Sequence, residues 1–590
     1  MAVAAGLAAG IGCGSGVVDL GTGGVGTGGA STSSGSGPGG NGGAVSTSST
    51  AGPGGAGGAA STSASSTSSA TSASSAASSG TTVICTPGDV QPCYSGPAGT
   101  QNVGICKAGS RTCNAGGTAF GACTGEVLPQ PIEDCSTPAD DNCNGSVNEA
   151  CVPGAVAWMR DDGSSSGDIG LAIGTDPAGN VFVGGMQNGG FTGTAIFSGS
   201  ALVLKRSGAG ASLWSKTFSA GTGGKYAVVR GLAADSTGRV IAVGEFVGTI
   251  DFGGGAFTSA GSSPDAFVVA LDQNGNHLWS HAYGDSQAQV AEGVAVDAAG
   301  NVFVTGKMAG TVDFGGGALA SAGGDDAFVV KLSASGQHLW SKRYGDVNSQ
   351  VGWSVAVTPQ GDIVVTGEFG GSMDFGGGTL TATGQPISSD VFVAKLQGAN
   401  GNQVWAKRYG DGNPQQGYRV AVDPMGNAVL AVQLRGSIDF GGGALTNADP
   451  TNAGSDVVVA KLDANGNYLW AKRYGDAALQ TPGGVAVDAA GNVALAGLFK
   501  GTINFGGSAF TDPSSATFDG FAAKLAAADG SHVWSYAIGD SSTQQSWAVS
   551  TDASGAVFVT GMYQGSITLG AAGTITSQGG ADLFTIKFAP

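Results

Sequence analysis

Apolar and polar residues alternate in short runs along the chain after residue 155, and the runs are bounded by Gly, Asn or Asp. The runs at 302–306 and 326–332, rich in Val and Phe, are typical. Alternation with a period of two places successive side chains on opposite faces of a strand, while Gly, Asn and Asp favour turns. The pattern therefore predicts short strands joined by turns. The same alternation, together with the high Gly content, excludes a helical repeat.

The strand pattern is itself repeated. One unit covers residues 293–346 and contains four predicted strands, of which the first ends in Asp297. Copies of this unit follow one another at intervals of 59 to 65 residues, which is the signature of a repeat architecture. The seven residues that end the first strands are Asp176, Asp235, Asp297, Thr358, Asp423, Asp488 and Asp552.

A tryptophan in the fourth strand counts the same units but is out of phase at both ends of the chain. The strand around Trp158 has no strands of its own unit before it, and the chain ends on a third-strand sequence, 582–588, with no Trp strand after it. In a ring, the first strand completes the last unit and leaves no ragged sheet edge. We therefore predict an all-β fold, a seven-bladed β-propeller of four-stranded blades closed by the N-terminal strand; a β-solenoid is the alternative. The tryptophans are Trp158, Trp214, Trp279, Trp340, Trp405, Trp470 and Trp534.

The repeat resembles the bacterial SBBP-type β-propeller repeat family. The resemblance rests on D-x-F-V-x-K-L, a Trp strand and Y-G-D, followed by V-A-V-D-x-x-G-N-V, and it covers residues 155–590. The first unit, at 191–200, and the last, at 567–573, depart from the D-F-G-G-G sequence of the others. The resemblance implies the propeller fold and carries no single activity.

Composition and charge exclude two classes of function. The 590 residues include 110 Gly, and 24 Lys and Arg oppose 42 Asp and Glu, for a formal charge of −18. Without a basic stripe, nucleic acid is not an expected partner. No apolar run reaches the roughly 20 residues that a membrane-spanning helix needs.

Eight of the nine cysteines lie between Cys85 and Cys151 in a segment rich in Gly, Pro, Asn and Asp. Such a segment cannot bury enough apolar surface to fold unaided, so the cysteines predict four disulfides and an oxidising compartment. Zinc is the alternative, but paired C-x2-C spacing and His ligands are missing. The connectivity is left open.

The N-terminal region predicts export and a tether. Cys13 follows an apolar run and resembles the lipidation cysteine of a bacterial lipoprotein; an incidental cysteine in a Gly/Ala-rich tail is the alternative. The stretch that follows is almost wholly Gly, Ser, Thr and Ala, a composition typical of a flexible coil. We divide the chain into a signal-like segment 1–13, a disordered tether 14–82, a Cys-rich metal-binding module 83–153 and the propeller 154–590.

One acidic segment has the spacing of metal ligands. Residues 140–149 follow D-x-[DN]-x-[DN]-G, which is how an oxygen-lined calcium loop begins, although Cys151 stands where a bidentate carboxylate is expected. With its cysteines the segment resembles the metal-binding motif of the MopE family of exported proteins, which implies copper as the alternative metal. An acidic turn fixed by disulfides is the structural alternative. The expected ligands are Asp140, Asn142, Asn144, Ser146, Asn148 and Glu149.

A second candidate site lies five residues before the Asp of each unit, where the residue type varies between units while its neighbours stay Val and Ala. Equivalent positions in a ring lie on one circle, so these side chains form one annulus, at the end of a strand where ligands meet propellers. Aromatic rings with an Arg and a Glu suit a sugar or a peptide; packing between blades is the alternative. The expected ligand-binding residues are Arg230, Glu292, Trp353, Tyr418 and Trp547, and the remaining positions are Leu171 and Gly483.

Repeated turn motifs account for the features that suggest catalysis. D-x-x-G-N is expected to be a turn, and the D-F-G-G-G sequences a hairpin connection, because no other part of a kinase or phosphate-binding motif accompanies them. His277, His338 and His532 precede Trp strands at positions expected to be exposed, and no triad is visible. Residues 463–470 resemble the Trp-bearing repeat of quinone-dependent dehydrogenase propellers, but the metal-bound quinone site is missing. We expect no enzyme activity.

These features predict an exported binding or adhesion scaffold, held at the cell envelope by a lipid or secreted, whose monomeric propeller presents a face to an extracellular protein or glycan. A quinone-dependent oxidoreductase and a purely structural envelope protein are the alternatives.

Overall fold

The structure, a computed structural model, describes residues 83–130, 140–146, 152–192, 195–384, 388–512, 514 and 517–590. In these residues the backbone is strand, turn and loop, and the single helical element is the 3₁₀ turn η1 (Gly570–Ala572). None of them forms a helix long and apolar enough to cross a membrane. The predicted all-β class is confirmed.

The repeat region folds into antiparallel sheets of four strands, with the strands of a unit side by side in chain order. A single bridge between Gly199 and Tyr226 joins the sheets of units 1 and 2. Units 1 to 3 contain β4 (Gly167–Thr175), β5 (Val181–Thr192), β6 (Ala195–Arg206), β7 (Ser212–Ser219); β8 (Tyr226–Ala234), β9 (Val240–Val247), β12 (Asp265–Leu271), β13 (His277–Tyr283); and β14 (Gln289–Val296), β15 (Val302–Met308), β18 (Asp326–Leu332), β19 (His338–Tyr344).

The remaining units have the same order. Units 4 to 6 contain β20 (Gln350–Val357), β21 (Ile363–Phe369), β24 (Asp390–Leu396), β25 (Gln403–Tyr409); β26 (Gln415–Val422), β27 (Ala428–Leu434), β30 (Asp456–Leu462), β31 (Tyr468–Tyr474); and β32 (Gln480–Val487), β33 (Val493–Phe499), β36 (Asp519–Leu525), β37 (His532–Ile538). Unit 7 contains β38 (Gln544–Thr551), β39 (Val557–Tyr563) and β42 (Asp582–Phe588), with β3 (Val156–Asp161) as its fourth strand.

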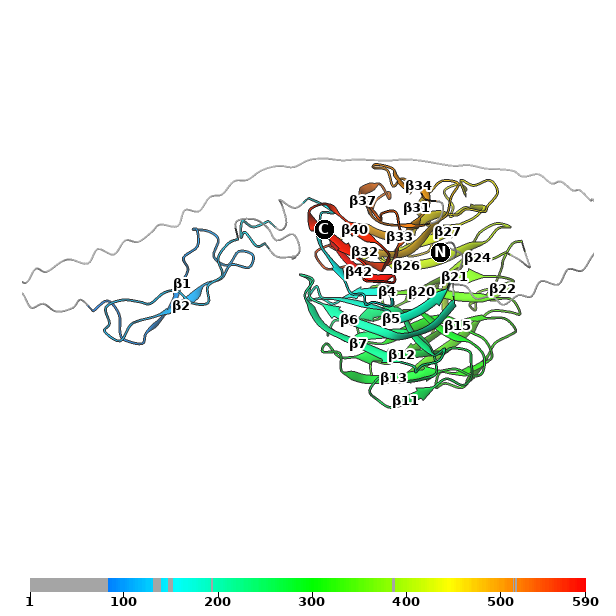
Figure 1. The fold of residues 1–590 in the computed structure, drawn as a ribbon, viewed down its shortest axis with the longest axis horizontal. Coiled ribbons are helices and arrows are strands. Elements are labelled where there is room, and N and C mark those ends of the chain that lie inside the picture. The colour runs from blue at the N-terminus through cyan, green and yellow to red at the C-terminus, as the bar shows by residue number, and fades with distance from the viewer. Residues whose placement is uncertain are drawn as a thin grey trace, which may run out of the picture. The chain divides into compact units, whose positions relative to one another are not determined.

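The N-terminal strand pairs with the C-terminal one, as the phase of the tryptophans predicted. Strand β3 lies antiparallel to β42, with Trp158 opposite Lys587, in the sheet β3-β42-β39-β38. The first strand of each unit contacts the first strand of the next, and β38 contacts β4. Figure 1 shows the red strand β42 near the cyan strand β4. Four-stranded sheets that meet through their first strands have the arrangement of a β-propeller.

Apolar side chains from facing sheets fill the space between neighbouring units. Between units 3 and 4, Phe303 and Val329 pack with Val365 and Phe392, all of them buried. Branched and aromatic residues favour strands because they pack well on a pleated, half-buried surface. Successive residues of one strand face opposite neighbours, since Val302 and Val304 pack against unit 2 whereas Phe303 packs against unit 4.

The D-F-G-G-G sequences form short hairpins, as predicted. In unit 3 the Asp313 carboxylate accepts hydrogen bonds from the amides of Gly315 and Gly317, and so closes the turn. Unit 1 has no such hairpin, because β5 and β6 continue as one long pair. The hairpin strands are β10 (Thr249–Asp251), β11 (Ala256–Thr258), β16 (Thr311–Asp313), β17 (Ala318–Ala320), β22 (Ser372–Asp374), β23 (Thr379–Thr381), β28 (Ser437–Ile438), β29 (Leu445–Thr446), β34 (Gly501–Ile503), β35 (Phe510–Asp512), β40 (Ser566–Thr568) and β41 (Thr574–Thr576).

One backbone carbonyl joins neighbouring units at every junction except that between units 6 and 7. The carbonyl oxygen of Ala464, in the last turn of unit 5, accepts hydrogen bonds from Trp405 Nε1 at 3.1 Å and Lys395 Nζ at 3.5 Å, both of unit 4. The same lysine lies 3.7 Å from Asp362 of its own unit. We call this carbonyl the shared acceptor. The other shared acceptors in the described residues are Gly208, Gln273, Ala334, Gly398 and Ala527.

Two units keep the shared acceptor although they lack one of its usual residues. Unit 2 has Ala270 where the others have lysine, and Arg239 supplies the cation instead, by donating to Ala334 O and pairing with Asp235 at 2.8 Å. Unit 4 has Thr358 in place of the repeat Asp, and Asp362 in the same turn supplies the carboxylate. The interaction thus persists while the residues that make it change.

The connection is interrupted between units 6 and 7. The turn that would carry the acceptor for Trp534 does not exist, because the third and fourth strands of unit 7, β42 and β3, come from opposite ends of the chain. In the described part of the protein the buried Trp534 Nε1 has no hydrogen-bond partner. Lys524, of unit 6, donates instead to Gly555 O at 2.9 Å.

This difference allows a matched test of the shared acceptor. We expect Trp405→Phe to reduce the free energy of unfolding by about 1 kcal/mol more than Trp534→Phe, because only Trp405 loses a hydrogen bond. Equilibrium unfolding in urea of the two variants and the wild type measures the difference. Equal losses would show that the Trp–carbonyl bond adds no stability.

The third strand of units 2 to 7 begins with a buried aspartate. In units 3, 4 and 5 an arginine pairs with it, as Arg473 does with Asp456 at 2.6 Å. Units 2 and 6 have Ala282 and Ala537 at the arginine position. Burial, with Asp512 and Asp540 nearby, raises the pKa of Asp519 in unit 6 to about 7.

The raised pKa of Asp519 predicts how stability depends on pH. The folded protein holds this proton above the pH at which an unfolded Asp, with a pKa near 3.9, loses it, so stability falls as the pH rises between about 4 and 7. Asp519→Asn cannot ionise. We expect its unfolding free energy, relative to wild type, to increase over this pH window and to level off above it. A difference that stays constant from pH 4 to 8 would contradict the assignment.

The described part of the Cys-rich segment contains the strands β1 (Val90–Cys93) and β2 (Gly109–Thr112), which form a two-stranded sheet. Its disulfides confirm the predicted chemistry. The bridges are Cys85–Cys113, Cys93–Cys123 and Cys106–Cys143. Cys135 and Cys151, the other two of the eight clustered cysteines, lie outside the described residues, as do Cys13 and the tether 14–82.

Candidate binding site at one end of the propeller channel

A β-bulge interrupts the first strand of every described unit at the same place. In β14 the pairing with β15 passes from Ala291–Gly306 to Gly293–Thr305, so Glu292 is an extra residue without a partner. A bulge redirects the side chain of the extra residue away from the regular alternation. The bulged residues are Leu171, Arg230, Glu292, Trp353, Tyr418, Gly483 and Trp547. They are the seven positions of the predicted annulus, but they lie in the middle of the first strands and not at a strand end. We call them the bulge ring.

A second ring of variable side chains accompanies the bulge ring, and the sequence analysis missed it. Its members occupy one position near the end of the second strand, in most units directly after a glycine. A Cβ on Gly306 would lie 2.0 Å from Val290 O, so the bulged strand leaves room only for glycine. The sequence signal that could have identified the second ring is a glycine followed by a residue that differs between units. The second ring comprises Met186, Glu245, Lys307, Glu368, Gln433, Leu498 and Met562.

Units 2 and 3 contribute charged side chains to the two rings. Arg230 Nη2 lies 2.5 Å from Glu245 Oε1, and Arg230 Nη1 lies 3.9 Å from Glu292 Oε2. Burial acts to lower the pKa of Arg230, but these two carboxylates more than offset it and hold the pKa above its ordinary value. Lys307 pairs with Asp325 at 3.0 Å. The charges on this side are therefore mostly compensated within the protein.

Units 4 and 5 contribute an aromatic stack and a hydrogen-bonded glutamate. The rings of Trp353 and Tyr418 are stacked, with centroids 5.8 Å apart and planes at 17°. Glu368 accepts hydrogen bonds from Trp353 Nε1 at 3.3 Å, Ser389 Oγ at 2.9 Å and Gln416 Nε2 at 3.1 Å. Burial raises the pKa of Glu368, and these hydrogen bonds act in the opposite direction.

Units 6, 7 and 1 contribute mainly apolar side chains to the two rings. Trp547 is 8% exposed and packs in a cluster with Met186, Leu498, Phe518 and Met562. It does not line the cavity described below. For this residue the structure favours packing between units, the alternative to a ligand contact.

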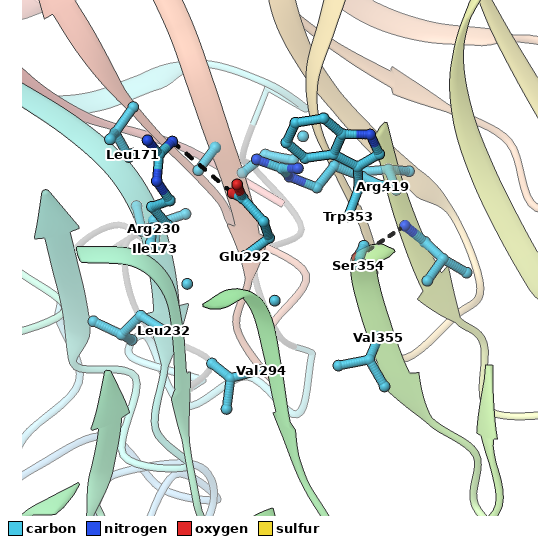
Figure 2. A pocket seen from close by; sticks show the side chains of 18 residues that line it. Leu171, Ile173, Arg230, Leu232, Glu292, Val294, Trp353, Ser354, Val355 and Arg419 are labelled. Atoms are coloured by element: carbon cyan, nitrogen blue, oxygen red, sulfur yellow. Dashed lines mark hydrogen bonds and ion pairs between the residues drawn. The ribbon is translucent and has the colours of Figure 1, made fainter. Parts of the chain in front are cut away.

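The first strands of all the units enclose a cavity of about 180 Å³ that is partly open to solvent. Among the described residues, Glu292 accepts no hydrogen bond, and Arg419 makes one, from Nη1 to the backbone carbonyl of Tyr418 at 2.9 Å. Arg419 has no carboxylate within 4.0 Å in the described part of the chain. Figure 2 shows Arg230 and Glu292 joined across one side, and Arg419 extending beside Trp353 toward Glu292. The charged and aromatic lining residues are Arg230, Glu292, Trp353 and Arg419.

Burial also acts on the two groups that face this cavity. It raises the pKa of Glu292, although the Arg230 guanidinium acts in the opposite direction. It lowers the pKa of Arg419, and the Glu292 carboxylate offsets part of that change. Glu292 and Arg419 are therefore close enough to stabilise each other's charge while keeping hydrogen-bonding capacity for a ligand.

The predicted metal loop is described only in part. The Asp140 carboxylate accepts hydrogen bonds from the amides of Asn144 at 3.1 Å and Gly145 at 2.8 Å, and the Asn144 side chain accepts one from Ser146 N at 2.9 Å. Oxygen atoms of this kind suit calcium, but Asn148 and Glu149 lie outside the described residues. Within those residues no three His, Cys, Asp or Glu side chains are grouped to hold a metal. Metal binding stays a prediction.

The histidines are half-buried rather than exposed, which corrects the sequence prediction. His277, His338 and His532 each place Nε2 about 3.0–3.1 Å from a serine hydroxyl three residues later. Each ring also lies against the second glycine of the hairpin turn in its unit. A role in packing the hairpin explains their repetition.

No family model matches the sequence, and no curated protein matches it. Similar solved structures include the quinohemoprotein alcohol dehydrogenase from Comamonas testosteroni, 13% identical over 73% of this chain and 76% of that one, with a TM-score of 0.36. The Pan2 WD40 domain of Neurospora crassa is 8% identical over 74% and 96%, with a TM-score of 0.38. A protein of unknown function from Bacteroides caccae is 11% identical over 55% and 94%, with a TM-score of 0.27. Likenesses this distant assign no activity, and the SBBP and MopE resemblances stay predictions.

The ion pair in the rings predicts a pattern of stability. Arg230→Met leaves Glu245, only 4% exposed, without its nearest cation, and we expect a loss of about 3–5 kcal/mol. Arg230→Met/Glu245→Met removes both charges and should recover most of that loss. Urea unfolding of the two variants checks the pattern; a double variant as unstable as the single one would contradict it.

Proposed function

We propose that the seven units form a closed, seven-bladed propeller that binds a ligand at the bulge ring. The contact of β38 with β4 supports closure, as do Trp158 and Lys587, from opposite ends of the chain, which both donate to Gly208 O in unit 1. One observation carries the binding function: the bulged residues differ between units, four of them line a cavity, and in that cavity Glu292 and the non-bulged Arg419 keep unused hydrogen-bonding capacity. A purely structural protein has no need of such a site.

An oxidoreductase is the less favoured function. The resemblance of residues 463–470 to quinone-dependent dehydrogenases concerns the Trp-bearing turn. In this protein that turn is occupied with joining units, because Ala464 O is a shared acceptor and Trp470 donates to Ala527 O. The residues around the cavity include carboxylates and guanidinium groups but no feature specific to a quinone. We therefore propose a binding protein rather than an enzyme.

The remaining parts of the proposal concern location. Three disulfides in the described residues favour an oxidising compartment, and therefore export. Lipidation of Cys13 would anchor the protein, and the tether 14–82 would hold a monomeric propeller away from the envelope surface, where it would face an extracellular protein or glycan. The Cys-rich module would bind a metal. These parts rest on the sequence.

An array that carries both glycans and peptides tests the binding function. We expect the labelled full chain to bind some array features saturably, and Glu292→Ala/Arg419→Ala to lose this binding. Arg473→Gln is the control, because it breaks an ion pair with buried Asp456 outside the cavity. If the double variant binds every array feature as the wild type does, or if the wild type binds none, the cavity is not a binding site.

A further inference from the structure

We infer that the cavity enclosed by the first strands binds a neutral saccharide ring, held by hydrogen bonds to Glu292 and Arg419. The inference rests on the proposed binding function and specifies the ligand class. It is drawn from the hydrogen-bonding capacity, the charge balance and the lining of the cavity.

The free hydrogen-bonding groups of the cavity are complementary in kind. An ionised glutamate only accepts hydrogen bonds, and an arginine only donates them. In the described residues Glu292 accepts none from the protein, and Arg419 gives one to a backbone carbonyl, so both keep capacity toward the cavity. A hydroxyl group donates and accepts at once. Neighbouring hydroxyls on one ring therefore satisfy both residues.

The charge balance favours a neutral ligand over an ion. Arg230 and Arg419 oppose Glu245 and Glu292, which leaves no net charge among these four groups. Lys307 is paired with Asp325, and the Glu368 carboxyl group already accepts three hydrogen bonds from the protein. An added buried charge has a high desolvation cost unless a group of opposite sign is free to pair with it. The Glu292 carboxylate already offsets part of the effect of burial on Arg419, so the two charges of a zwitterion would replace that attraction rather than add a new one. Hydroxyl groups leave that attraction in place.

The lining and size of the cavity agree with a ring-shaped ligand. The indole of Trp353 lines the cavity and is fixed by its stack on Tyr418 and its hydrogen bond to Glu368. A pyranose presents C–H groups on its faces and hydroxyls at its rim, so it can rest an apolar face on the indole. A volume of about 180 Å³ equals roughly six waters at about 30 Å³ each, which suits one sugar ring rather than an oligosaccharide.

The test uses small probes on the full chain. Methyl glycosides of glucose, galactose and mannose are the neutral probes, L-alanine is the zwitterion and acetate is the anion. Saturation-transfer NMR detects binding and calorimetry gives the Kd, at concentrations up to about 50 mM, well above a Kd of roughly 1 mM for a weak site. We expect at least one glycoside to bind saturably and neither charged probe to bind.

The variants assign the binding to the two residues. Glu292→Ala and Arg419→Ala should each raise the Kd about tenfold or more, because each removes hydrogen bonds to a charged group. Glu292→Gln keeps one acceptor and should lose less. Arg473→Gln should leave the Kd unchanged, which separates loss of the site from loss of stability. Binding of alanine or acetate with the same dependence on Glu292 and Arg419, or no glycoside binding, would overturn the saccharide assignment. Array binding of peptides alone would leave the proposed binding function standing.

Discussion

The arrangement of the sheets depends on one interaction: in units 1 to 6 the backbone carbonyl in the last turn is bound by a tryptophan and a cation of the preceding unit. Apolar packing between sheets is strong but has little direction, so by itself it fixes neither the spacing nor the rotation of one unit against the next. A carbonyl that accepts two hydrogen bonds from defined positions fixes both. Because the cation also pairs with a carboxylate of its own unit, the buried charge is compensated, as buried charges must be.

The shared acceptors explain which features of the fold the sequence predicted and which it could not predict. Periodicity alone predicted the strands, the turns, the role of the seven tryptophans and the pairing of the two ends, because every unit repeats the same sequence pattern. Periodicity could not predict the residues that replace a missing partner in units 2 and 4. Arg239 takes the place of a lysine that unit 2 lacks, and Asp362 takes the place of the Asp missing from unit 4. Neither residue stands at the aligned position, so only the fold brings Arg239 to the shared acceptor and Asp362 to the cation that binds one.

The candidate site was predictable in position but not in composition. Variable residues among uniform Val and Ala identified the bulge ring, since a side chain that leaves the regular alternation of its strand is free to differ between units. The physical cause, a bulge at the same place in each first strand, was not visible, because no residue type is specific to a bulge of this kind. Partners from the second strand, above all Glu245 and Glu368, also escaped notice. Their contacts reach across a ladder of strands, and for Glu368 across units, which one-dimensional spacing does not encode.

The pairing of β3 with β42 has a consequence for how the protein is made. Every other sheet is assembled from one continuous stretch of chain and can form as soon as that stretch is available. The last sheet has to wait for the C-terminal strand, and the N-terminal strand stays unpaired until that strand has been made. Closing so long a loop is slow, and an unpaired edge is prone to wrong partners. Assembly therefore ends with a single late event that joins the two ends of the domain.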